Sequence, residues 1–192
     1  MPVRRRRASP GLVVALLLAT VLTGCAQALP AGGGRESGDI PLPGQEWALK
    51  DGRVDAAEYR TAMGRFVACV RKAGYPVTEP VVSPADRLTL IYEITPSGDP
   101  TTYNNAVQDC NLAHLSMVAP TYVEARPQVM EAPLRTAVGD CLRRRGVRLT
   151  AAERNLRDFA RSAGDETWVV DCVTSVWQKV YPDLPAEVPL RF

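Results

Sequence analysis

The chain has 192 residues, of which 46% are hydrophobic and 23% charged, with five cysteines and a single histidine. These proportions are those of a globular protein, and one histidine excludes any site that needs two histidine ligands. The formal charge of +2 depends on the arginines Arg4 to Arg7, because the sequence after residue 24 has 19 basic and 21 acidic residues. This balance disfavours a nucleic-acid partner.

The N-terminus has the order of a secretory signal peptide. The four arginines are followed by a run from Leu12 to Leu22 in which Thr20 is the one polar residue. A run of about eleven residues is too short to cross ~30 Å of hydrocarbon as a helix, but it fits the apolar core of a signal peptide. We therefore expect residues 1–24 to direct export and to be removed.

Leu22-Thr23-Gly24-Cys25 closes this run and resembles a bacterial lipobox of the actinobacterial prolipoprotein type. The resemblance covers residues 1–25. It implies that the Cys25 thiol receives a diacylglycerol group, that Cys25 becomes the mature N-terminus, and that the protein is held on the extracytoplasmic side of the cell membrane. Two or three acyl chains give firm anchoring, whereas one chain is marginal. The alternative is cleavage by an ordinary signal peptidase, with no role for Cys25.

Residues 25–46 are expected to form the lipidated cysteine and a flexible tether. Glycine and proline are frequent between residues 26 and 46, and no apolar period occurs there. This composition is typical of a linker, and about 20 flexible residues span roughly 25 Å. The folded domain is then expected over residues 47–192, held off the membrane surface.

Four cysteines remain after the tether, and their surroundings repeat. Cys69 and Cys141 each begin the pattern cysteine, apolar, arginine, basic, any residue, glycine, apolar, whereas Cys110 and Cys172 each follow an aspartate. No pair has the Cys-x-x-Cys spacing of zinc ribbons, and an exported location is oxidising, so two disulfides are favoured over a metal site built from four thiolates. The repeat predicts the pairs Cys69–Cys110 and Cys141–Cys172.

The same repeat predicts two homologous halves within one compact domain, at about 50–120 and 128–184. Two repeats are too few for a solenoid. The predicted pairing makes each half self-contained and keeps both closed loops short. Pairing of Cys69 with Cys141 is the alternative, and it requires the two corresponding helices to lie side by side.

Capping signals place the helices of the first half. An Asp55-x-x-Glu58 capping box begins one helix, and Gly74 supplies its left-handed stop. An aspartate–proline pair at 99–100 begins a second helix, which Pro120 is expected to end.

The remaining elements complete a mainly helical prediction. Residues 88–94 alternate in the manner of a strand. The second half is expected to contain a helix near 131–145, a helix that begins with the capping box of residues 150–153, and a helix from 165 to about 180. The predicted fold class is therefore mainly α with a minor β element, a duplicated helix-pair domain clamped by two disulfides.

The last predicted helix contains two tryptophans. Trp168 lies four residues before Cys172, so both are expected to face inward. Trp177 lies nine residues after Trp168, which places it on the opposite face at 100° per residue. Trp177 is therefore either part of an exposed contact surface or buried between the two halves.

Arg143, Arg144 and Arg145, together with Arg148, form the one basic cluster after the signal peptide. One interpretation is a solvated helix C-terminus stabilised by the helix dipole. The other is a surface that contacts anionic head groups or cell-wall polyanions.

Residues suited to catalysis are scarce. No nucleophile elbow, phosphate-binding loop, dinucleotide fingerprint or calcium loop occurs in the sequence. His114 is expected to pack within a helix face, with its ring nitrogens bonded to backbone or water. The adjacent carboxylates Asp165 and Glu166 are expected to stabilise a helix N-terminus. We therefore predict no catalytic residue, no metal and no cofactor.

The pattern Cys-apolar-Arg-x-x-Gly at Cys69 and Cys141 is similar to that of small exported, disulfide-bonded actinobacterial lipoproteins without an assigned activity. The resemblance implies export and disulfide bonding, and it carries over no catalytic residue. The sequence therefore predicts a membrane-anchored lipoprotein with a non-catalytic binding role toward a protein or cell-wall partner. The alternative is a glycan-directed cell-envelope hydrolase that uses paired carboxylates.

Overall fold

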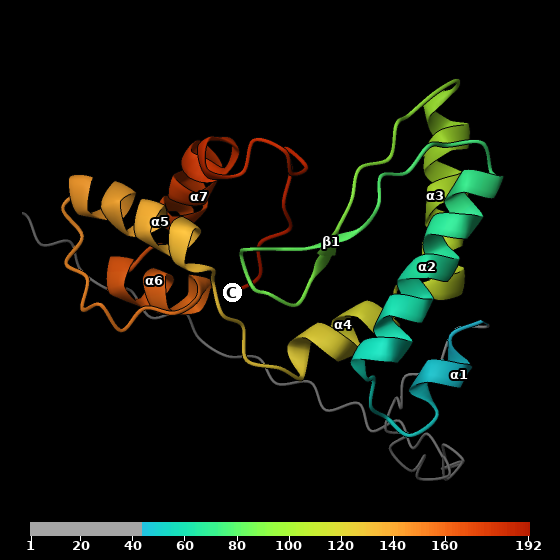
Figure 1. Ribbon diagram of the computed structural model, residues 1–192, viewed down its shortest axis with the longest axis horizontal. Coiled ribbons are helices and arrows are strands. Elements are labelled where there is room, and N and C mark those ends of the chain that lie inside the picture. The colour runs from blue at the N-terminus through green and yellow to red at the C-terminus, as the bar shows by residue number, and fades with distance from the viewer. Residues whose placement is uncertain (1–43) are drawn as a thin grey trace, which may run out of the picture. The chain divides into compact units, whose positions relative to one another are not determined.

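The computed structural model describes residues 44–192, which form helices and a two-stranded antiparallel sheet (Figure 1). The predicted mainly helical class with a minor β element is confirmed. The signal peptide, Cys25 and most of the tether lie outside the described residues. In chain order the elements are α1 (Glu46–Leu49), α2 (Ala56–Lys72), β1 (Val81–Val82), β2 (Leu90–Ile91), α3 (Pro100–His114), α4 (Val118–Glu124), α5 (Ala132–Arg144), α6 (Leu156–Ala163) and α7 (Glu166–Val180).

Helix α2 begins and ends where its sequence signals predict. The Asp55 carboxylate accepts hydrogen bonds from the Ala57 and Glu58 amides at 2.7 and 2.8 Å, and Glu58 Oε2 accepts from the Asp55 amide at 2.9 Å. Gly74 follows the helix with a φ of +97°, a conformation that glycine adopts without strain. Local chemistry therefore sets both ends of this helix.

Two disulfides join the helix pairs as predicted. Cys69 on α2 bonds Cys110 on α3, and Cys141 on α5 bonds Cys172 on α7. In both pairs the Cα atoms are 5.7 Å apart. Each bond lies within one predicted half, and α2 packs against α3 as α5 packs against α7.

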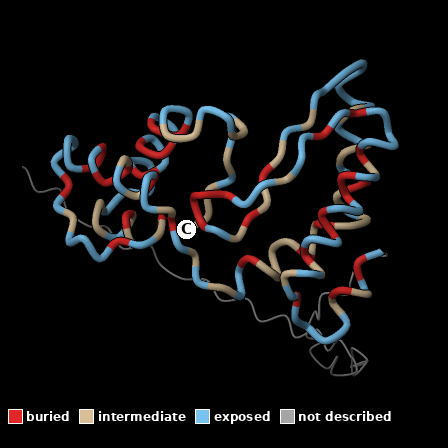
Figure 2. The backbone as a smooth tube through the Cα atoms, viewed as in Figure 1, coloured by how far each residue is buried: buried red, intermediate tan, exposed pale blue. Residues whose placement is uncertain are grey.

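The buried hydrophobic residues form two clusters. Figure 2 marks the buried residues in red along the backbone. The N-terminal cluster consists of Ala48, Val54, Tyr59, Ala62, Met63, Phe66, Val67, Val70, Tyr75, Val77, Cys110, Leu115 and Val118. The C-terminal cluster consists of Ala85, Ile91, Met130, Leu134, Val138, Cys141, Leu142, Val147, Leu156, Phe159, Val169, Cys172, Val173, Val176 and Trp177.

The hairpin belongs to both clusters, so the halves are less self-contained than their disulfides suggest. Strand β2 is shorter than the predicted 88–94, and it pairs with β1 in the register Val81 with Ile91 and Val82 with Leu90. Ile91 is part of the C-terminal cluster, whereas Leu90 and Tyr92 pack against the N-terminal cluster. Neighbouring strand residues point to opposite faces, so one short strand serves two cores.

The prediction that Pro120 ends a helix is wrong. Helix α3 ends at His114, and Pro120 is the third residue of α4. A proline is tolerated there because the first N–H groups of a helix have no partner within the helix. The Gln45 side chain provides the acceptor that the first amides of α4 need, because its Oε1 accepts hydrogen bonds from the Met117 and Val118 amides at 2.9 and 3.1 Å.

Gln45 also corrects the predicted tether boundary. Its side chain is fully buried, and Nε2 donates to the Leu112 carbonyl at 2.7 Å and to Ser116 Oγ at 3.0 Å. The folded domain therefore includes residues before 47. A glutamine in a glycine-rich segment carries no local signal of burial, because its partners lie about 70 positions away.

The prediction that Trp168 faces inward is wrong, and Trp177 is the buried tryptophan of α7. Trp168 is 40% exposed, whereas Trp177 is 1% exposed within the C-terminal cluster and donates from Nε1 to the Pro185 carbonyl at 2.7 Å. Cys172 lies at one edge of the buried stripe, which is centred on Val169, Val173 and Val176. Trp168, four residues before Cys172, falls about 40° beyond that edge.

Helix α6 begins later than the capping box of residues 150–153 predicts. Ala151 has a φ of +66°, a left-handed conformation in which a helix cannot start. Asn155 is the actual N-cap, and its Oδ1 accepts from the Asp158 amide at 2.9 Å. The buried face of α6 includes Leu156 and Phe159.

Candidate functional site

Two adjoining cavities share the side chain of Arg191, and they are the candidate binding site. The first, the groove, has a volume of about 650 Å³, and the second, the arginine pocket, has a volume of about 640 Å³. The groove is lined by Tyr59, Met63, Thr89, Leu90, Ile91, Tyr92, Asn111, Leu115, Ser116, Ala119, Pro120, Glu187, Val188, Pro189 and Arg191. The arginine pocket is lined by Glu124, Arg126, Pro127, Gln128, Asn155, Arg157, Arg191 and Phe192.

The groove is formed by two parts of the chain that are far apart in the sequence. Helix α2, the region of strand β2, and helices α3 and α4 with the turn between them contribute one part, and residues 187–191 contribute the other. Trp177 helps to hold this C-terminal segment, because its Nε1 donates to Pro185. Val188, Leu190 and Phe192 pack against the C-terminal cluster. The groove therefore depends on the tertiary packing of the C-terminal segment.

Neutral polar groups accompany the apolar lining of the groove. Tyr59 Oη accepts a hydrogen bond from the Leu90 amide at 2.9 Å, and its ring stacks on Tyr122 with a centroid separation of 4.6 Å. Burial raises the pKa of Tyr59, and burial raises the pKa of Tyr92 to about 12. Both phenols are therefore uncharged at neutral pH. This surface suits a ligand with apolar parts and a few hydrogen-bonding groups.

The arginine pocket contains a cation that is fixed in place. Arg126 Nη2 donates to the Val54 carbonyl at 2.8 Å and Nη1 donates to the Tyr122 carbonyl at 2.7 Å, while the guanidinium lies 3.9 Å from the Tyr122 ring centroid. Arg157 Nη2 donates to the Phe192 main-chain oxygen at 2.7 Å.

The predicted basic cluster is partly neutralised by acidic neighbours. Arg143 pairs with Asp140 at 2.6 Å, and Arg145 pairs with Asp171 at 3.1 Å. Arg144 is exposed in the last turn of α5. Two of the four arginines of this cluster therefore have a carboxylate partner, which weakens its interpretation as a polyanion-binding surface.

Trp177 is not a surface contact residue. Its 1% exposure excludes the predicted role in an aromatic contact surface. The other interpretation, burial between the two halves, is correct in the burial but not in the place, because Trp177 lies inside the C-terminal cluster. A hydrogen bond to Pro185 satisfies its indole N–H, which a buried tryptophan requires.

The remaining residues that could serve catalysis are the acid pair at the start of α7 and His114. Asp165 is the N-cap of α7, and its Oδ1 accepts from the Thr167 amide at 2.7 Å. Glu166 is exposed in the first turn, where the helix dipole favours an acid. His114 Nδ1 is buried and has no hydrogen-bond partner among residues 44–192, so the predicted backbone bond is not formed at this nitrogen.

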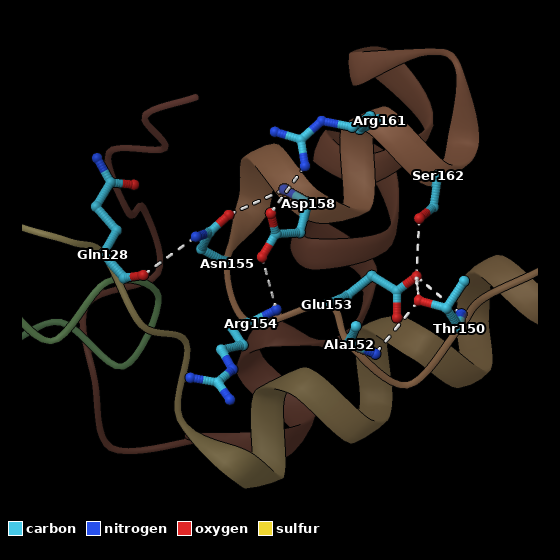
Figure 3. A network of polar contacts seen from close by, with 9 residues as sticks. All are labelled: Gln128, Thr150, Ala152, Glu153, Arg154, Asn155, Asp158, Arg161 and Ser162. Carbon is cyan, nitrogen blue, oxygen red and sulfur yellow. Dashed lines mark hydrogen bonds and ion pairs between the residues drawn. The ribbon is translucent and has the colours of Figure 1, made fainter.

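Glu153 is the buried acid of the C-terminal half, and its polar network is shown in Figure 3. Its Oε1 accepts from the Thr150 amide at 2.9 Å, from Thr150 Oγ1 at 3.0 Å and from Ser162 Oγ at 2.8 Å. Burial by itself raises the pKa of Glu153, but these hydrogen bonds more than offset that effect, and the pKa is lowered to about 2. Glu153 is therefore an ionised structural anchor for the loop before α6.

No sequence motif identified the residues of either cavity. Arg126, Arg157 and Arg191 lie on separate segments of the chain, and they share a cavity only after folding. Within residues 44–192, no helix is long and apolar enough to cross a membrane. No protein-family model matches the chain, and no curated protein or solved structure is similar enough to serve as a relative.

Proposed function

We propose that the protein is a lipid-anchored extracytoplasmic binding protein, attached through Cys25. Two intrachain disulfides support an exported location, because such bonds persist in oxidising compartments. The lipobox-like Leu22-Thr23-Gly24-Cys25 supports the anchor. The partner is a protein or a cell-wall polymer.

The groove is the observation that most directly supports the proposed binding role. Its volume of about 650 Å³ lies within the range of ligand sites, and its lining combines apolar side chains with hydroxyl and amide groups and with the charged residues Glu187 and Arg191. The Cys69–Cys110 disulfide joins α2 and α3, which both contribute to the groove, and this cross-link reduces the ordering that binding requires.

The anchor is tested by fractionating cells that express the full chain. The wild-type protein should enter the membrane fraction with an acyl-modified Cys25 detectable by mass spectrometry. Cys25→Ala should lose both the acyl mass and membrane retention, whereas the tether variant Gln27→Ala should keep both. Equal membrane retention of Cys25→Ala would reject the anchor.

The groove is tested by cross-linking in intact cells, followed by isolation from detergent-solubilised membranes. Ala119→Arg places a long side chain in the groove and should abolish the cross-linked species that the wild-type protein forms. Leu112→Arg is the matched control, because Leu112 is 40% exposed on α3 and does not line the groove. Unchanged cross-linking of a folded Ala119→Arg variant would reject the groove as the binding site.

A further inference from the structure

The arginine pocket has more positive charge than its surroundings neutralise. Arg126 contacts backbone carbonyls and an aromatic ring, and it has no carboxylate partner among residues 44–192. Arg191 pairs with Glu124 at 3.5 Å, so one of the three arginines of the pocket has a carboxylate partner among the described residues. Three guanidiniums face Glu124 and, where Phe192 is the last residue, its carboxylate. A surplus of positive charge remains in either case.

The guanidinium of Arg126 is oriented before any ligand arrives. Two carbonyls and the Tyr122 ring hold its plane, so binding an anion need not immobilise a free side chain. A guanidinium has five N–H donors, and the hydrogen bonds to Val54 and Tyr122 use two of them. Donors therefore remain for an anion.

Three arginines around one cavity suit an anion with more than two oxygens. Guanidinium groups bind phosphate oxygens in paired, charge-assisted hydrogen bonds. A cavity of about 640 Å³ also has room for the group that carries the phosphate. We infer that the arginine pocket binds a phosphate group, carried either by a phospholipid head group or by a soluble phosphate ester.

This inference goes beyond the proposed function, because it adds a phosphate ligand in the arginine pocket to the protein or cell-wall partner of the groove. The proposed acyl anchor at Cys25 would hold the protein at the membrane, where phosphate head groups are concentrated. Because Arg191 lines both cavities, a phosphate in the pocket would sit beside the groove.

The soluble arm uses the full chain in uncharged detergent, titrated with inorganic phosphate, glycerol 3-phosphate and acetate by calorimetry. Both phosphates should bind, and acetate should bind at least tenfold more weakly. Arg157→Gln should weaken phosphate binding about tenfold, the loss expected for one charge-assisted contact. Arg144→Gln is the matched control, because Arg144 is also exposed but lies outside the pocket, and it should bind as the wild type does.

The membrane arm uses vesicles of phosphatidylglycerol or of phosphatidylcholine with the Cys25→Ala full chain, so that the anchor cannot supply the binding. Preference for phosphatidylglycerol that is lost in Arg157→Gln assigns the phosphate to a head group, whereas binding to glycerol 3-phosphate alone assigns it to a soluble ester. Arg126→Lys keeps the charge but loses the planar fork, and it should also bind phosphate more weakly. A thermal unfolding curve for each variant identifies loss of fold.

Equal phosphate binding by the wild type and a folded Arg157→Gln variant would overturn the inference. So would acetate binding as tight as phosphate binding, or no binding to either phosphate source. If Arg126→Lys does not fold, the Arg157→Gln result decides. If phosphate does not bind, but Cys25 is acylated and cross-linking depends on the groove, the phosphate assignment is rejected. The proposed binding function then still stands.

Discussion

The two disulfide-bonded helix pairs have the same cross-link but different packing. In each pair the Cα atoms of the cysteines are 5.7 Å apart, and the bonds join residues separated by 41 and 31 positions. Helix α7 buries Val169, Cys172, Val173, Val176 and Trp177, whereas the buried residue of α3 is Cys110 (Figure 2). Helix α3 is therefore held mainly by its disulfide and by side chains that are only partly buried.

This difference shows that one sequence pattern can support two sources of stability. The chain-entropy estimate is nearly equal for the two loops, about 3.5–4 kcal/mol each. Buried apolar area then favours α7. An edge contact between Tyr75 and Tyr103, with centroids 5.0 Å apart, adds to the hold on α3. We therefore expect the local stability of α3 to depend on its disulfide more than the local stability of α7 does.

The largest expected effect is at Trp177. Trp177→Ala should lower the free energy of unfolding by about 3–5 kcal/mol, because it leaves a cavity in the C-terminal cluster and frees the Pro185 carbonyl. Trp168→Ala, on the exposed side of the same helix, should change it by less than about 0.5 kcal/mol. Urea denaturation measures both. Similar losses in the two variants would show that α7 is not packed as described.

Removing each disulfide separately tests the comparison directly. Replacing both cysteines of a pair with alanine should cost about 3.5–4 kcal/mol in either half. Hydrogen exchange should differ: without Cys69–Cys110 the amides of α3 should lose most of their protection, whereas without Cys141–Cys172 those of α7 should keep much of theirs. Greater loss in α7 than in α3 would contradict the proposed division between packing and cross-link.

A third variant tests the polar clamp of the N-terminal half. Gln45→Leu leaves the Met117 and Val118 amides without their acceptor and should cost about 2–3 kcal/mol. Hydrogen exchange should rise first at the start of α4. Gln108→Leu is the control, since Gln108 is exposed on α3 and should leave α4 unaffected. An unchanged α4 in Gln45→Leu would mean that the clamp is dispensable.

The smallest expected effect is the pH dependence of the C-terminal half. The pKa of Glu153 is lowered from 4.5 to about 2 in the folded protein. The unfolded chain therefore takes up a proton at higher pH than the folded chain, so the contribution of Glu153 is complete above about pH 4.5 and is lost as the pH falls to about 2.

Glu153→Gln should cost about 1–2 kcal/mol at pH 7 and flatten the stability profile between pH 4.5 and 2. Unfolding measured at pH 7 and pH 3 gives the difference. Glu166→Gln, at an exposed site in the first turn of α7, should leave the slope as in the wild type. A slope unchanged in Glu153→Gln would assign the acid sensitivity to other carboxylates.

Short-range signals account for the parts of the fold that were predicted correctly. The ends of α2 and the starts of α3 and α7 follow from Asp55, Gly74, Asp99 and Asp165, whose effects reach a few residues along the chain. The disulfide pairing followed from the repeated surroundings of the cysteines. These features could be predicted because their causes lie within one helical turn or within a repeat.

Tertiary structure alone decided the rest. The burial of Trp177 in place of Trp168 depends on where α5 and the C-terminal segment lie against α7, and the role of Gln45 depends on amides about 70 positions away. The arginine pocket joins Arg126, Arg157 and Arg191 from separate segments. Local sequence determines which residues can begin or end a helix, whereas burial and the grouping of like charges depend on which distant segments meet.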